Sequence, residues 1–194
     1  KLLDFAYTNT FSTLKVGRVR YGLMLREDGF VIDDGTAARL AQNHFVMTTT
    51  TAAAGPVMKH LEFIHQCLRP DWDVQMISVT EHWAQFAVAG PNARTLLNAL
   101  LDSPIDNQSF PFMSCGDVGV GGVDARLFRI SFSGELGDEI AVPARFGDAL
   151  FRLLALHPEV PGVGLSGPEA LTGAPHRDGF PPPPQLDSPL ARVR

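Results

Sequence analysis

Apolar and polar positions alternate through residues 17–40 in a pattern that predicts a β-hairpin. The Asp28-Gly29 pair between the two apolar runs favours a two-residue turn in which both residues adopt positive φ. That turn places Leu23 opposite Asp34. Because side chains alternate between the two faces of a strand, Asp34 is then expected to face inward and Asp33 outward. The other pairs of this register are Leu25 with Ile32 and Tyr21 with Thr36, and Tyr21 lies within reach of the Asp34 side chain.

The rest of the chain alternates strand-like and helix-like segments. Strands are predicted at residues 44–51, 74–80, 84–90 and 138–143, with a second hairpin over residues 117–133. Helices are predicted at residues 57–68, 93–102 and 146–157, and the threonines before the first of them are candidate N-caps. Strands that follow one another as hairpins, with helices between them, favour an α+β fold with antiparallel sheets and packed helices.

Composition narrows the class of protein. The chain has 194 residues, of which 45% are hydrophobic and 19% charged, so it can bury a sizeable core. A net charge of −5 gives no basic surface for nucleic acid. No apolar run approaches the roughly 20 residues that span a bilayer, so no membrane partner is expected. Cys67 and Cys115 indicate neither a disulfide framework nor a metal site, and we expect a reduced, cytoplasmic setting.

The two ends of the chain differ from its middle. The first residue is Lys1, and the opening segment KLLDFAYTN is typical of the end of an amphipathic helix. We therefore expect the chain to begin inside a domain. Residues 157–194 hold nine of the fifteen prolines, a composition that buries too little apolar surface to offset the entropy of ordering. The sequence predicts a domain over residues 1–156, truncated at its N-terminus, and a poorly ordered tail over residues 157–194.

Two carboxylates are the candidates for chemistry. Asp34 is either a functional carboxylate or a turn-capping residue before Gly35, and the pattern alone leaves both open. Glu139 is a second candidate, although most glutamates on strands are simply solvated. The glycines of GVGGV at residues 119–123 precede a strand pattern, so they predict a hairpin turn and no phosphate site. The histidines lack metal-ligand spacing, so no metal is expected.

Five segments occur in an order that resembles the tetrahydrofolate-binding domain of the glycine-cleavage aminomethyltransferase (T-protein) superfamily, the GcvT type. They are GRVRYGLMLREDGFVIDDGTAARL, HFVMTTTT, AVAGPNARTLL, FPFM and RISFSGELGDEI. Within this superfamily the residues of these segments are most similar to those of the α subunits of bacterial heterotetrameric sarcosine oxidases. The resemblance covers residues 1–156 and implies the same α+β fold.

The resemblance also implies roles for five residues. Asp34 matches an aspartate that assists one-carbon transfer near the folate amines, and Tyr21 matches its tyrosine partner. Glu139 matches a glutamate that binds the pterin ring. Thr50 and Phe132 stand where T-proteins carry an asparagine and a tyrosine in the folate site.

The implied activity is that of a domain in an oxidoreductase complex that demethylates sarcosine. This domain would accept the one-carbon unit on tetrahydrofolate and form 5,10-methylenetetrahydrofolate. By the same resemblance, FAD, FMN and NAD belong to other parts of the complex, and the partners are its β, γ and δ subunits. Two alternatives stay open: a non-catalytic folate-binding or regulatory module, and an inactive product of a truncated gene.

The chain departs from the family pattern at two places. Asp138 stands where relatives usually carry an aromatic or aliphatic residue. After the last predicted helix, the family motif YGTEA…LRAEKGF is replaced by SGPEALTGAPHRDGF, which keeps only Glu169-Ala170 and Gly179-Phe180. We therefore expect the tail to have diverged from the family fold.

Overall fold

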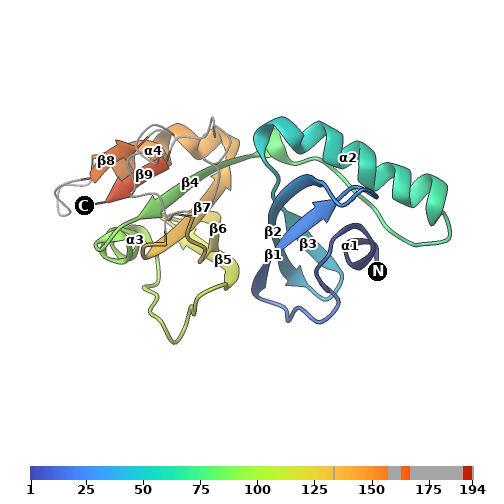
Figure 1. The fold of residues 1–194 in the computed structure, drawn as a ribbon. Helices are drawn as coiled ribbons and strands as arrows, with labels where there is room; N and C mark the ends of the chain where they lie inside the picture. The colour runs from blue at the N-terminus through green and yellow to red at the C-terminus, as the bar shows by residue number, and fades with distance from the viewer. Residues whose placement is uncertain (133, 157–162, 167–189, 194) are drawn as a thin grey trace. The chain divides into compact units, whose positions relative to one another are not determined.

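The computed structural model describes residues 1–132, 134–156, 163–166 and 190–193, and it divides into two compact units, Lys1–Val79 and Thr80–Arg194 (Figure 1). Each unit is described below by itself. The predicted tail, residues 157–194, lies outside the described residues except for two short strands. The domain boundary at residue 156 stays a prediction.

Unit 1 is a three-stranded antiparallel sheet with two helices. The strand order is β1-β2-β3, and a π-helical turn continues the second helix. The elements are α1 (Leu2–Ala6), β1 (Arg18–Leu25), β2 (Val31–Ala41), β3 (His44–Met47), a 3-10 turn (Thr51–Ala53), α2 (Ala54–Phe63) and the π-helical turn (Ile64–Leu68).

The first hairpin forms, but with a different tip from the one predicted. Gly29 has a φ of +85° whereas Asp28 does not adopt positive φ, and the Arg26 amide donates to the Phe30 carbonyl at 2.8 Å. The loop therefore has three residues, with the glycine in the left-handed position that such loops require. Leu25 consequently pairs with Val31, and the predicted pairing with Ile32 is wrong.

A β-bulge then restores the predicted register. Between Met24 and Leu25 the pairing shifts by one residue, so that Met24 lies opposite Asp33. The predicted pairs Leu23–Asp34 and Tyr21–Thr36 are confirmed because the residue gained by the loop is offset at the bulge.

The core of unit 1 lies on the sheet face that carries Gly22, Met24 and Asp33. Met24 is fully buried against α1 and α2. A Cβ on Gly22 would lie 2.9 Å from both the Tyr7 and the Phe11 ring, so only glycine lets these aromatic rings approach the strand. This packing explains why the segment before β1 folds over this face of the sheet.

Unit 2 is a six-stranded sheet of order β5-β6-β7-β4-β9-β8, antiparallel except between β4 and β9. Its strands are β4 (Trp83–Ala89), β5 (Cys115–Val120), β6 (Val123–Phe128), β7 (Gly137–Pro143), β8 (Val163–Ser166) and β9 (Leu190–Val193). Its helices are α3 (Ala93–Leu100) and α4 (Gly147–Ala155), with 3-10 turns at Thr80–His82 and Ala144–Phe146.

One face of this sheet packs against the helices, and the other face carries Glu139. Ile140 and Val142 of β7 are buried with Leu96 and Leu97 of α3 and Leu150 and Leu154 of α4, so both helices contribute to one core. Because side chains alternate along a strand, Glu139 lies on the opposite face, across from Ala87 of β4 and Phe128 of β6.

The predicted α+β class with antiparallel sheets and packed helices is confirmed. The predicted helices are present with ends shifted by a few residues, and Gly121 and Gly122 form the predicted hairpin turn. The predicted strand at residues 74–80 is wrong: Val74 and Met76 pack on the unit 1 core, but this segment joins no sheet. No threonine side chain caps α2 or the 3-10 turn before it. Among the described residues, no helix has the length and apolar character that crossing a membrane requires.

Candidate functional site

The Tyr21 and Asp34 side chains meet on one face of the first hairpin. They are diagonal neighbours on β1 and β2, and the Tyr21 hydroxyl donates to Asp34 Oδ2 at 2.6 Å. About half of the Tyr21 side chain is exposed, at 49%. Thr36, directly opposite Tyr21, shares this face. The structure thus brings together the two residues predicted for chemistry at a place that a ligand can reach.

Tyr21 is a fixed hydrogen-bond donor near neutral pH. Partial burial raises the pKa of Tyr21 to about 12, and the hydrogen bond to Asp34 and the charges of Asp34 and Asp33 act in the same direction. The phenol therefore keeps its proton over the physiological range. Asp34 Oδ2 is held by this donor, and the carboxylate is oriented before any ligand arrives.

The prediction that Asp34 faces inward and Asp33 outward is wrong. Asp33 is the buried carboxylate, with 7% exposure, and Asp34 is half-buried. Asp33 accepts hydrogen bonds from the Thr50 hydroxyl at 2.8 Å and from the Thr50 amide at 3.1 Å. Its charge also adds to the effect of burial in raising the pKa of Tyr7 to about 12. Thr50 therefore lies beside Asp33, whose side chain points away from the face of Asp34.

Gly35 allows the chain after β3 to pass close to β2. The Thr36 amide donates to Thr48 Oγ1 at 3.0 Å, and the Thr48 amide donates to the Thr36 carbonyl at 2.8 Å. A Cβ on Gly35 would overlap the carbonyl oxygen of Thr48. This contact involves backbone atoms, so no side-chain rotation relieves it.

We expect Gly35→Ala to destabilise unit 1 by about 1–3 kcal/mol, as overpacking does in well-packed cores. Urea unfolding followed by circular dichroism measures the change. The matched control is Gly55→Ala in the first turn of α2, where a Cβ meets nothing within 4 Å. Alanine there is expected to be neutral or to stabilise by up to about 1 kcal/mol. Equal effects of the two substitutions would contradict this account of Gly35.

In unit 2, Glu139 is a half-buried carboxylate with one side-chain partner in the described structure, the Gln85 amide, which donates to Glu139 Oε2. Burial raises the pKa of Glu139 to about 7, although the Gln85 hydrogen bond acts in the opposite direction. Near neutral pH the group is poised between its two protonation states, a property common at functional sites. Phe132, the other residue predicted for this unit, is 59% exposed in the connection between β6 and β7.

Behind Glu139, the neighbouring residue Asp138 points into the core and pairs with Arg94 of α3. Arg94 Nη2 lies 3.1 Å from each Asp138 oxygen, and Asp138 is 1% exposed. Burial raises the pKa of Asp138, while the charges of Arg94 and Arg129 oppose that rise.

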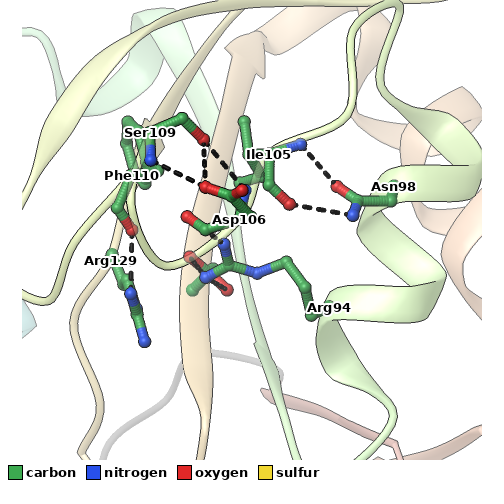
Figure 2. A network of polar contacts seen from close by, with 8 residues as sticks. Arg94, Asn98, Ile105, Asp106, Ser109, Phe110 and Arg129 are labelled. Atoms are coloured by element: carbon green, nitrogen blue, oxygen red, sulfur yellow. Dashed lines mark hydrogen bonds and ion pairs between the residues drawn. The ribbon is translucent and has the colours of Figure 1, made fainter.

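The same network holds the connection between α3 and β5 (Figure 2). Asn98 exchanges two hydrogen bonds of 2.9 Å with the Ile105 backbone, and Arg129 donates to the Phe110 carbonyl at 2.8 Å. Asp106 accepts hydrogen bonds from the amides of Gln108 and Ser109. The buried ion pair is thus part of a framework that fixes this connection against the sheet that carries Glu139.

The sequence does not identify three residues that lie beside the candidates. In unit 1 it places Asp33 on the wrong face and gives Thr36 only as the pairing partner of Tyr21, and in unit 2 it carries no signal for Gln85. Knowledge of the β4–β7 register would have found Gln85, because it lies diagonally across from Glu139. In the part of the chain that the structure describes, no three His, Cys, Asp or Glu residues gather as a metal site would require.

The fold of these units is that of an aminomethyltransferase. The solved structure of glycine cleavage system aminomethyltransferase T from Bartonella henselae matches 78% of this chain and 39% of its own, with a TM-score of 0.65 and 24% sequence identity. The model of the GCVT N-terminal domain family matches residues 1–174, and the chain belongs to that family. The resemblance inferred from the sequence segments is confirmed.

Curated relatives place the chain near two groups of proteins within this family. It is 48% identical over 174 residues to "Sarcosine oxidase subunit alpha" of Rhizobium meliloti (strain 1021), and 46% identical over 149 residues to the protein of that name from Corynebacterium sp. (strain U-96). These matches cover 89% and 76% of this chain but only 18% and 15% of the relatives. An aminomethyltransferase of Geobacillus sp. (strain WCH70) is 33% identical over 133 residues, which cover 69% of this chain and 35% of that protein.

Proposed function

We propose that this chain is the tetrahydrofolate-binding part of a sarcosine oxidase α-like protein. In this proposal it receives the one-carbon unit from oxidative demethylation of sarcosine, and 5,10-methylenetetrahydrofolate is the product. The hydrogen bond between Tyr21 and Asp34 is the observation that carries the proposal, because it prepares an accessible carboxylate for proton transfer. The identity of 48% to a sarcosine oxidase α subunit supports the choice of parent reaction.

The residues fit tetrahydrofolate chemically. The pyrimidine edge of a pterin is rich in hydrogen-bond donors, and the carboxylate of Glu139 is an acceptor on the face of β7 opposite the core. Phe132 offers an exposed ring close in sequence to that strand. In the proposal Glu139 and Phe132 of unit 2 are pterin contacts. In unit 1, Asp34 with Tyr21 serves the reacting amines, and Thr50 is a separate polar contact on the side of Asp33.

Asp34 has two tasks in the transfer. Tetrahydrofolate supplies two amine nitrogens, N5 and N10, that take up a one-carbon unit. The Asp34 carboxylate stabilises the positive charge of the incoming iminium and accepts a proton that the attacking amine releases. As N5 and N10 form bonds to the iminium carbon, the bond from that carbon to the glycine nitrogen breaks, and glycine leaves with the protons that the two amines release. Tyr21 occupies Oδ2, so the proton is taken up at Oδ1, and the high pKa of Tyr21 keeps the tyrosine a donor throughout.

The amine oxidation itself lies elsewhere in this proposal. FAD, FMN and NAD act in other parts of the parent complex, whose β, γ and δ subunits are the protein partners. A cytoplasmic location is proposed with the complex. The chain spans less than a fifth of the sarcosine oxidase α subunits it matches, so its part in the complex is that of one domain.

Tetrahydrofolate affinity should rise with pH through about 7. Ligand donors need the ionised form of Glu139, and protons compete for that carboxylate below its raised pKa of about 7. We expect affinity to fall by about tenfold per pH unit well below that value. Isothermal titration between pH 5.5 and 8.5 measures this, and Glu139→Gln should bind more weakly with little pH dependence.

Exposed Glu81 on the 3-10 turn before β4 provides the control, because Glu81→Gln should leave both affinity and pH dependence unchanged. Equal affinities of the wild-type chain and Glu139→Ala at pH 8 would reject Glu139 as a pterin contact. Absence of any binding at millimolar tetrahydrofolate would reject the proposed function itself.

A further inference from the structure

The buried Asp33 carboxylate accepts a hydrogen bond from the Thr50 hydroxyl. Asp33 accepts hydrogen bonds from the amide and the hydroxyl of Thr50, at 3.1 and 2.8 Å, and is only 7% exposed. Thr50 is half-buried, so part of the residue reaches the surface. It precedes a 3-10 turn but makes no side-chain cap, which leaves the hydroxyl to Asp33.

The direction of this hydrogen bond follows from the two groups. An ionised carboxylate can only accept, and a threonine hydroxyl has one hydrogen to donate. Once that hydrogen points at Asp33 Oδ1, the remaining capacity of Thr50 Oγ1 is that of an acceptor. The second bond, from the Thr50 amide to Asp33 Oδ2, fixes the backbone, so the hydroxyl cannot easily turn away.

We infer that Asp33 is a positioning residue that makes Thr50 an acceptor-only contact, selective for an N–H of a reduced pterin. This inference rests on the proposed function and adds a basis for specificity to it. Tetrahydrofolate carries hydrogens on N5 and N8, whereas folic acid has bare ring nitrogens at both positions. A site that presents only an acceptor favours the reduced ligand, whose N–H can donate to it. The bare nitrogen of folic acid is also an acceptor, so no hydrogen bond forms between it and Thr50.

Asp33→Asn tests the inference because it reverses the direction of the hydrogen bond with Thr50 Oγ1 without changing the shape of the side chain at position 33. The asparagine oxygen can still accept from the Thr50 amide, but its NH₂ group then faces Thr50 Oγ1. The threonine hydrogen is forced outward, where it meets the ligand as a donor. Thr50→Val removes the hydroxyl at similar volume, and Thr50→Ser keeps it.

Dissociation constants for tetrahydrofolate and folic acid are measured by anaerobic titration of the 194-residue chain and its variants. Asp33→Asn and Thr50→Val are each expected to weaken tetrahydrofolate binding by about tenfold. Folic acid binding should change by less than about twofold in Thr50→Val and should become stronger in Asp33→Asn, where the outward hydrogen of Thr50 meets the bare ring nitrogens. Thr50→Ser should keep the wild-type preference. Asp28→Asn, at the exposed hairpin tip, is the matched control and should change neither constant.

The ratio of the tetrahydrofolate affinity to the folic acid affinity separates positioning from general structural damage, since a loosened fold weakens the binding of both ligands alike. An unchanged ratio in Asp33→Asn and in Thr50→Val would overturn the inference while leaving the proposed function standing. If Asp33→Asn fails to fold, Thr50→Val decides alone. A wild-type chain that binds neither ligand would contradict the proposed function on which the inference rests.

Discussion

Asp34→Ala is expected to lower the rate of one-carbon transfer by about 100-fold or more while sarcosine oxidation continues. The size follows from the loss of a positioned general base, which typically contributes factors of 10² to 10⁴. The oxidation should persist because, under the proposed function, it takes place elsewhere in the parent complex. In the variant, released formaldehyde should replace the 5,10-methylenetetrahydrofolate that the wild-type domain forms.

The experiment places the substitution in the assembled complex and measures hydrogen peroxide and 5,10-methylenetetrahydrofolate in the same reaction. Asp28→Ala, at the exposed tip of the same hairpin, controls for general effects of losing an aspartate. Tyr21→Phe should give a smaller loss than Asp34→Ala, because it removes the donor that orients Asp34 but leaves the carboxylate. Equal transfer by wild type and Asp34→Ala would reject a catalytic Asp34 and favour a non-catalytic folate-binding module.

The second large effect concerns stability. Arg94→Met is expected to destabilise unit 2 by about 3–5 kcal/mol at neutral pH, because it leaves the Asp138 charge buried without its closest partner. Methionine keeps most of the arginine's apolar stem, so lost packing contributes little. Arg152→Met is the control: its ion pair with Asp148 is exposed, so this substitution should leave the free energy of unfolding close to the wild-type value.

The pH dependence of this effect has a definite sign. Burial raises the pKa of Asp138, and the charge of Arg94 opposes that rise. In Arg94→Met this opposing charge is missing, so the folded-state pKa of Asp138 rises further above its unfolded value. The folded state then holds the proton more tightly, and the variant loses stability as pH rises from about 4 toward that raised pKa. Urea unfolding at pH 4.5 and pH 7.5 measures the difference. The double variant Arg94→Met/Asp138→Leu should recover much of the loss, and full stability of the single variant at pH 7.5 would contradict the account.

The order and type of most elements could be predicted because their signals are local. The apolar spacing of α2, α3 and α4 and the alternation in β4 and β7 are properties of short segments. Residues 74–80 show the limit of this reasoning. Val74 and Met76 alternate with exposed neighbours as strand residues do, but their side chains pack on helices, and only the tertiary fold decides whether a backbone partner is present.

The inward face of the first hairpin could not be read from hydrophobicity. Tyr21, Leu23 and Leu25 form the more apolar stripe, yet the packed face is the one with Gly22, Gly35 and Asp33. Glycine adds nothing to a hydrophobic pattern, although here it marks where aromatic rings and a neighbouring backbone approach. Residue resemblance identified Asp34 and Tyr21 correctly as neighbours, whereas their surroundings depend on packing that the alternation pattern does not record.

In the hairpin that holds Tyr21 beside Asp34, two irregularities in the pairing cancel each other. Its three-residue tip advances one strand by a residue, and the bulge opposite Met24–Leu25 takes that residue back. Between the turn and the bulge, a residue added to one strand must be matched by a residue added to the other if Tyr21 is to stay beside Asp34. The same holds for a residue removed. A single inserted or deleted residue in the tip would turn the two adjacent aspartates over, exposing the buried one and withdrawing the accessible one. The spacing between turn and bulge therefore determines which of the two aspartates is accessible beside Tyr21.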